Sequence, residues 1–214
     1  MHQYVKTLEN ISGRYAPSRV LSFDMVHVFK ALQLMKNRGH VSRDLLCHEL
    51  DLGEGTIKTL LKHLKMHDMI RSTNAGTKMT SKAITIFSEL LSNIPIETNI
   101  PKCSIALGKF NYVVLLKQFS FAIKSGIEQR DSAIKMGALG ATTMLFKEGK
   151  FVMPDSNYES MKKEPFIHRL LIEKLKPEEN DIIIIGSDDL SEKTAELAAK
   201  SAALLTIMNH EKHM

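Results

Sequence analysis

The sequence contains no tryptophan, only two cysteines and six prolines, and no long hydrophobic run within its 214 residues. Cys47 and Cys103 stand alone, which excludes a disulfide framework and a cysteine-based zinc site. Apolar runs such as residues 182–185 are strand-sized, whereas a membrane helix needs about 20 apolar residues. The first fifteen residues lack the apolar core of a signal peptide. We therefore expect a cytoplasmic protein without a membrane partner.

The motifs that mark common catalytic sites are also missing. There is no G-x-S-x-G nucleophile turn and no glycine-rich phosphate loop. His63 and His67 lie four residues apart beside Asp68, but a metal site needs a third ligand at a clear spacing. The adjacent Asp188 and Asp189 are more typical of a helix cap than of a cation site. We therefore expect no enzyme, no metal and no cofactor.

The net charge of +5 is unevenly distributed along the chain. The first hundred residues hold 13 Lys and Arg against 9 Asp and Glu, and the remainder holds 16 against 15. Six of the nine histidines also lie in the first hundred residues. This excess of positive charge indicates a polyanion partner for the N-terminal half, although scatter of this size is also common in ordinary proteins.

Apolar residues recur at helical spacing in three successive segments of the N-terminal half. The pattern predicts helices over residues 23–35, 42–50 and 54–67, a hairpin over residues 69–80 around Gly76, and a further helix from residue 81. The predicted N-caps are Ser22, Ser42 and Ser81. Residues 51–55 are predicted to form a turn in which two glycines supply the tight geometry.

This order of elements in residues 20–92 resembles the winged-helix form of the helix-turn-helix. The segment Met79-Thr80-Ser81-Lys82 is similar to the L-T-x-K-G exit of many winged-helix regulators, with Ala83 in place of the glycine. The resemblance implies that the helix over residues 54–67 enters the major groove of double-stranded DNA and that the hairpin forms the wing. The alternative is a winged helix used only for protein contact.

Lysines on one side of the helix over residues 54–67 favour DNA binding over protein contact. Lys58, Lys62 and Lys65 face away from its apolar residues, and Glu54, its one acid, lies in the first turn, where the helix dipole favours negative charge. The early residues of this helix are expected to lie nearest the bases. Its later residues and the wing are expected to lie near the phosphates. The predicted DNA-binding residues are Glu54, Thr56, Lys58, Thr59, Lys62, His63, Arg71 and Lys78.

Residues 94–102 contain two prolines and little periodicity, which predicts a linker between two domains, residues 1–93 and 103–214. Strands and helices then alternate. Strands are expected at residues 104–107, 112–117, 142–146, 151–153 and 181–185, and helices at residues 127–138, 164–175 and 190–208. The β-branched run in residues 182–185 predicts a central strand buried on both faces. The fold class is therefore α/β (α+β overall), a winged helix followed by a small α/β sheet domain.

Three features of the second half carry a further resemblance. They are Arg130-Asp131 at an alanine-containing helix, the segment Gly137-Ala138-Leu139-Gly140-Ala141-Thr142-Thr143, and Gly186 after the apolar strand. Together with the N-terminal pattern they resemble an archaeal family of winged-helix proteins whose C-terminal domain is uncharacterised. The resemblance implies two domains and a regulatory role, and it names no functional residues.

Polar residues near these glycines and after the apolar strand are candidates for a small-molecule pocket. In open α/β sheets ligands gather outside the carboxyl ends of strands, and a helix N-terminus favours anions. The structural alternatives are a salt bridge, a turn and a helix cap. The candidate ligand-binding residues are Arg130, Asp131, Thr142, Thr143, Ser187, Asp188 and Asp189.

The sequence thus predicts a transcriptional regulator that binds DNA as a homodimer and senses a small-molecule effector through its C-terminal domain. Dimerisation is expected because one winged helix makes few phosphate contacts. The alternative is a small-molecule enzyme whose winged helix contacts another protein. A purely structural adaptor is a third possibility.

Overall fold

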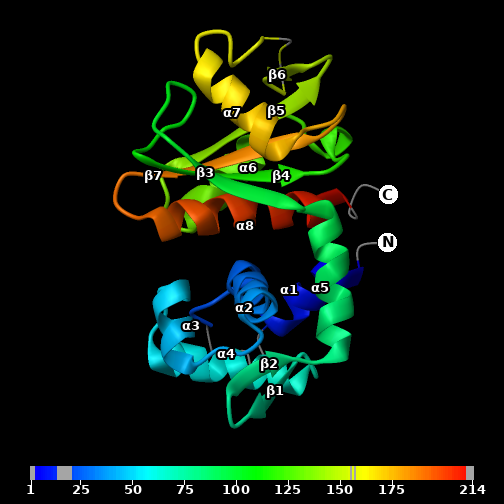
Figure 1. Cartoon of the computed structure of the whole chain (residues 1–214), viewed down its shortest axis with the longest axis vertical. Coiled ribbons are helices and arrows are strands. Elements are labelled where there is room, and N and C mark those ends of the chain that lie inside the picture. The colour runs from blue at the N-terminus through cyan, green and yellow to red at the C-terminus, as the bar shows by residue number, and fades with distance from the viewer. Residues whose placement is uncertain (1–2, 14–20, 155, 157, 211–214) are drawn as a thin grey trace. The chain divides into compact units, whose positions relative to one another are not determined.

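The computed structural model describes residues 3–13, 21–154, 156 and 158–210. The chain divides into two compact units, Met1–Leu91 and Ser92–Met214, a boundary that falls inside helix α5. The first is mostly helical and the second is built around a sheet, which confirms the predicted α+β fold class (Figure 1). No helix among the described residues has the length and apolar character needed to cross a membrane.

The N-terminal unit has the predicted order of elements, with an additional helix before them. The elements are α1 (Gln3–Ile11), α2 (Met25–Arg38), α3 (Arg43–Leu50), α4 (Glu54–Met66), β1 (Ile70–Thr73), β2 (Gly76–Met79) and α5 (Ser81–Asn93). Strands β1 and β2 pair antiparallel, with Ile70 opposite Met79 and Thr73 opposite Gly76. Phe29 of α2 packs against Phe87 of α5 with ring centroids 5.3 Å apart. Apolar faces of the helices therefore meet in one core.

Two of the three predicted N-caps are wrong by one or two residues. Asp24, not Ser22, caps α2, because its carboxylate accepts the amide of Val26 while the His27 ring accepts the amide of Asp24. Ser42 caps α3 as predicted. Thr80, not Ser81, caps α5, since its hydroxyl oxygen accepts the amide of Ala83, three residues further along.

The turn between α3 and α4 is shorter than predicted. Asp51 takes the left-handed conformation there, with φ of 54°. Gly53 is the N-cap of α4, and Gly55 already lies inside that helix. The tight geometry expected of glycine is thus adopted by an aspartate, a residue that tolerates it better than most.

The C-terminal unit contains a five-stranded sheet in the order β3-β4-β7-β5-β6. Its elements are β3 (Ile96–Ile100), β4 (Phe110–Leu116), a 3₁₀ turn (Ser120–Ala122), α6 (Ile127–Lys135), β5 (Gly140–Lys147), β6 (Lys150–Val152), α7 (Pro165–Leu175), β7 (Ile182–Asp188) and α8 (Glu192–His210). Strand β7 lies in the middle and all its residues are buried, as predicted. Helix α7 covers one face of the sheet and α8 the other (Figure 1).

Two features of this unit differ from the sequence-based expectation. Residues 96–100, predicted to lie in a linker, form the edge strand β3, because Pro95 and Pro101 flank the strand and do not interrupt its hydrogen bonds. Residues 104–107, predicted as a strand, form a turn followed by a bend. Every pairing in the sheet is antiparallel, so the rule that places ligands at the carboxyl ends of parallel strands does not apply.

Candidate nucleic-acid interface

Helix α4 separates its side chains into a buried and a cationic side. Ile57, Leu60 and Leu64 are buried in the N-terminal unit. Lys58, Lys62 and Lys65 are exposed, and none of the three forms an ion pair with any residue that the structure describes. The spacing of four and three residues aligns these ammonium groups along one side of the helix.

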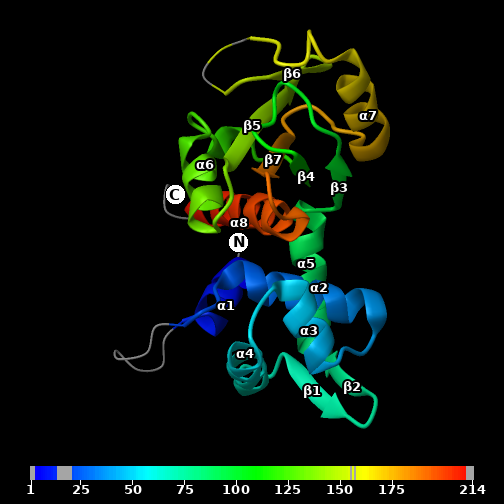
Figure 2. The same cartoon turned by 90° about the vertical axis from the view of Figure 1, so that its left-hand side faces the viewer.

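A hollow of about 430 Å³ lies between α4, the start of α3 and the β1–β2 hairpin, which lie side by side in Figure 2. Its lining includes four cations and no carboxylate: Arg43, Lys58, Thr59, Leu61, Lys62, Lys65, Ile70, Ser72 and Thr77. Such a concentration of unpaired positive charge repels itself and favours a bound polyanion. Arg43, at the first position of α3, was not predicted, because the lysine spacing that indicates the site lies within α4 alone.

A second hollow, of about 470 Å³, adjoins the first through Arg43 and Lys58. Glu54, Gly55 and Asp44 complete its lining, so its charge is mixed. Glu54 is exposed and Thr56 is half-buried. The Thr59 hydroxyl donates to the carbonyl of Gly55 at 3.0 Å, which leaves its oxygen lone pairs available as acceptors. The first two turns of α4 therefore present both an acid and hydroxyl groups.

His63 is a core residue and not the predicted DNA contact. Its side chain is 3% exposed, its ring lies edge-on to Phe23, and its Nδ1 is 2.7 Å from the carbonyl oxygen of Ile11. That carbonyl ends α1 and lacks a partner within the helix. The side of α4 that carries His63 is thus turned into the N-terminal unit, away from the lysines.

Arg71 and Lys78 lie away from the cationic hollow. They face each other across the hairpin and, with Lys36, line a separate hollow of about 320 Å³. Ser72 and Thr77, one residue further along each strand, line the cationic hollow instead. Because successive strand residues point to opposite faces, the predicted wing contacts belong to the other side of the hairpin.

Lys82 and His67 meet where α4 ends. The Lys82 ammonium donates to the carbonyl of His67 at 2.9 Å. Partial burial, the Lys82 charge and His63 together hold the pKa of His67 below its usual 6.5. The imidazole is therefore neutral at pH 7 and adds no positive charge to this region. Among the described residues, no group of three or more His, Cys, Asp or Glu side chains is placed to hold a metal ion.

Asp188 and Asp189, two of the ligand candidates, have structural roles. Asp188 accepts the amides of Leu190 and Ser191 at 3.1 and 2.8 Å, at the entrance to α8. Asp189 accepts the amide of Lys109 at 2.9 Å. Both carboxylates organise the chain before α8, as the structural alternative proposed.

The other ligand candidates are spread over several surfaces. Arg130 and Asp131 pair with each other on the exposed side of α6 at 3.2 Å. Thr142 donates to the carbonyl of Ile105, whereas Thr143 and Ser187 are buried with hydroxyl oxygens that lack a partner among the described residues. Neighbouring strand positions point to opposite faces, so Thr142 and Thr143 cannot share a pocket. The sequence-based pocket is therefore not assembled.

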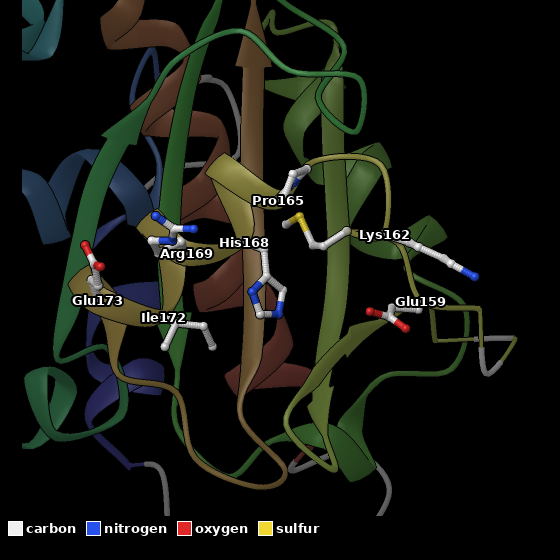
Figure 3. Close-up of a pocket in the computed structure, with 8 residues that line it drawn as sticks. Glu159, Lys162, Pro165, His168, Arg169, Ile172 and Glu173 are labelled. Carbon is white, nitrogen blue, oxygen red and sulfur yellow. The ribbon is translucent and has the colours of Figure 1, made fainter.

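A different hollow of about 530 Å³ lies beside α7, where Figure 3 places His168 at its centre. Its lining is Glu159, Met161, Lys162, Pro165, His168, Arg169, Ile172 and Glu173. The His168 ring contacts Phe151 edge-on at 5.3 Å. Arg169 and Lys162 lie on opposite sides of His168 in Figure 3, with Glu173 near Arg169. The charged groups surround an apolar floor without converging on one point.

Comparisons with known proteins match both units. Residues 27–84 match the family model described as PH0730-like, N-terminal domain, and residues 107–207 match the model described as a domain of unknown function (DUF4443). No curated protein matches the chain. A solved structure, hypothetical protein PH0730 from Pyrococcus horikoshii OT3, is similar with a TM-score of 0.69 and 24% identity over 87% of this chain and 94% of that one. The chain thus shares its fold with an archaeal protein, and none of these descriptions names a regulator.

Proposed function

We propose that the protein is a DNA-binding transcriptional regulator whose N-terminal unit lies against duplex DNA through the cationic hollow of α4. The observation that supports this most strongly is the hollow itself, where Arg43, Lys58, Lys62 and Lys65 gather without a carboxylate. Surface helices that need only solubility commonly mix acids with lysines, because pairs of opposite sign stabilise a helix. A phosphate backbone supplies the missing negative charge.

In this proposal α4 enters the major groove, which is about 12 Å wide and admits one α-helix. Glu54, Thr56 and Lys58 in its first turns are placed for base edges, where glutamate accepts from cytosine and lysine donates to guanine. Arg43, Lys62 and Lys65 contact the flanking phosphates. Ser72 and Thr77 of the hairpin donate hydrogen bonds to the same backbone.

The regulator acts as a homodimer, because a single winged helix makes too few contacts for specific binding. Its C-terminal unit holds the dimer and responds to a small-molecule effector. The effector alters DNA affinity only if it binds two conformations of the protein unequally. We propose no catalytic role for either unit.

The test uses a duplex recovered from a random library by the purified full-length chain. Fluorescence anisotropy is then compared for the wild type, for Lys58→Ala/Lys62→Ala, and for the control Lys147→Ala/Lys163→Ala, which removes two exposed lysines from the C-terminal unit. We expect about 10-fold or greater loss of affinity for the first variant only. Equal affinity of all three proteins would contradict the proposal, and a small-molecule enzyme would show no selected duplex at all.

A further inference from the structure

The outer side of α6 carries apolar and charged residues whose side chains remain about half exposed. Gln129 and Ser132 turn inward and bond to Thr206 and Ser201 of α8 at 2.8 and 3.0 Å. On the opposite side, Ile127 and Ile134 are 51% and 50% exposed. Two half-exposed isoleucines two helical turns apart form a stripe on a helix whose other side is already packed.

Arg130 and Asp131 fill the stripe between the isoleucines. Their side chains are 51% and 53% exposed, and each is the other's partner at 3.2 Å. The patch continues beyond the helix. A side chain at Gly140 would touch both Leu107 and Arg130, which places Leu107, 60% exposed, beside this stripe. Leu139, 45% exposed, immediately precedes Gly140.

We infer that α6 packs antiparallel against α6 of a second copy of this chain, around a two-fold axis between residues 130 and 131. The stripe Ile127-x-x-Arg130-Asp131-x-x-Ile134 complements itself when it is reversed. Ile127 then meets Ile134 of the second copy, and Arg130 meets Asp131 of the second copy, with both contacts repeated by symmetry. An isologous interface requires this reciprocity of contacts.

Charge complementarity selects a second copy over an unrelated partner. An unrelated protein needs no palindromic order of isoleucine, cation, anion and isoleucine, whereas a two-fold contact needs that order. A standard interface buries about 800 Å² per partner. The α6 patch is smaller than that, because the helix has only nine residues. The dimer is therefore concentration-dependent, with Leu107 and Leu139 at its edge.

The inference rests on the proposed function in that it names the surface of the proposed homodimer, but its test needs no DNA. Sedimentation equilibrium measures the dimer dissociation constant of the full-length chain. Arg130→Asp or Asp131→Arg alone places like charges opposite each other twice, and we expect about 10-fold or greater weakening of the dimer. Arg130→Asp/Asp131→Arg restores the complementary order, and its dissociation constant returns to within about 3-fold of the wild type.

Lys147→Asp, a charge reversal at an exposed position of β5 outside the patch, is the control and keeps the wild-type constant. Far-UV circular dichroism checks that every variant is folded. A wild type that stays monomeric at the highest soluble concentration overturns the inference, as does a dimer that the single reversals leave intact or the double swap fails to restore. DNA binding by a monomeric wild type would overturn the α6 contact and the homodimer but not the DNA contacts of α4, and a dimer that binds no duplex would overturn the DNA proposal alone.

Discussion

His63 joins two helices that are far apart in the sequence of the N-terminal unit. Its ring nitrogen bonds to the carbonyl of Ile11, and its edge packs on Phe23. We expect His63→Leu to lower the free energy of unfolding by about 1–3 kcal/mol, because the buried carbonyl of Ile11 is left without this partner. Urea denaturation measures the change. A stability equal to that of the wild type, or a DNA affinity reduced as far as in the lysine variant, would contradict a purely structural role.

We expect His67 to make the free energy of unfolding depend on pH. Burial and the Lys82 charge lower its pKa in the folded chain, so the unfolded chain binds the proton more tightly. The free energy of unfolding should therefore fall as the pH drops from 6.5 through the lowered pKa of the folded chain. Above pH 6.5 the contribution of the neutral His67 should be fully present. We expect His67→Asn to flatten this part of the stability profile, measured by urea denaturation between pH 7.5 and pH 5. An unchanged slope would show that His67 does not contribute to it.

Gly186 allows α8 to lie directly on the central strand β7. A methyl group there would lie closer than 3.0 Å to the backbone of Ala195 and Ala199, and backbone atoms cannot rotate away. We expect Gly186→Ala to destabilise the chain by about 3 kcal/mol or more. The matched control is Gly55→Ala in α4, where nothing lies within 4 Å, and we expect it to be neutral or stabilising by up to about 1 kcal/mol. Calorimetric unfolding of both variants decides whether this close approach is needed.

Elements with a strong local signal were predictable from the sequence. The β-branched run of β7 and the apolar period of α4 depend on neighbouring residues alone, and both elements lie where they were predicted. The edge strand β3 was missed because its pairing with β4 outweighs the flanking prolines. His63 was misassigned because the contact that buries it comes from Ile11, 52 residues away.

The candidate site was predictable only in part. The lysine spacing on α4 located the cationic side, but the hollow also needs Arg43 from α3 and two hydroxyls from the hairpin. The proposed ligand residues share glycine-rich segments of the sequence, yet the alternation of β5 and the caps before α8 separate them in space. Tertiary packing, which one sequence does not display, decides which polar residues meet.

The molecule as a whole is proposed to bind two half-sites through two N-terminal units held together by α6. We expect Arg130→Asp to weaken binding to a duplex with paired half-sites by about 10-fold and to leave binding to a single half-site unchanged. The reason is that the second half-site is bound effectively only while the two copies stay joined. Anisotropy titrations with both duplexes measure the difference. Equal losses on both duplexes would place residue 130 in DNA contact and contradict its role between copies.

Lysine and arginine side chains bound to phosphate should make the affinity of the chain for DNA fall steeply with salt. The slope of log K against log salt concentration, measured on the selected duplex, tests this most directly, because each phosphate contact contributes about 0.9 to it. We expect Lys58→Ala/Lys62→Ala to make the slope shallower by about 1, because Lys62 is the phosphate contact of this pair, and the Lys147→Ala/Lys163→Ala control to keep the wild-type slope. A wild-type slope near zero, or an equal slope in the Lys58→Ala/Lys62→Ala variant, would contradict the assignment of α4 to DNA.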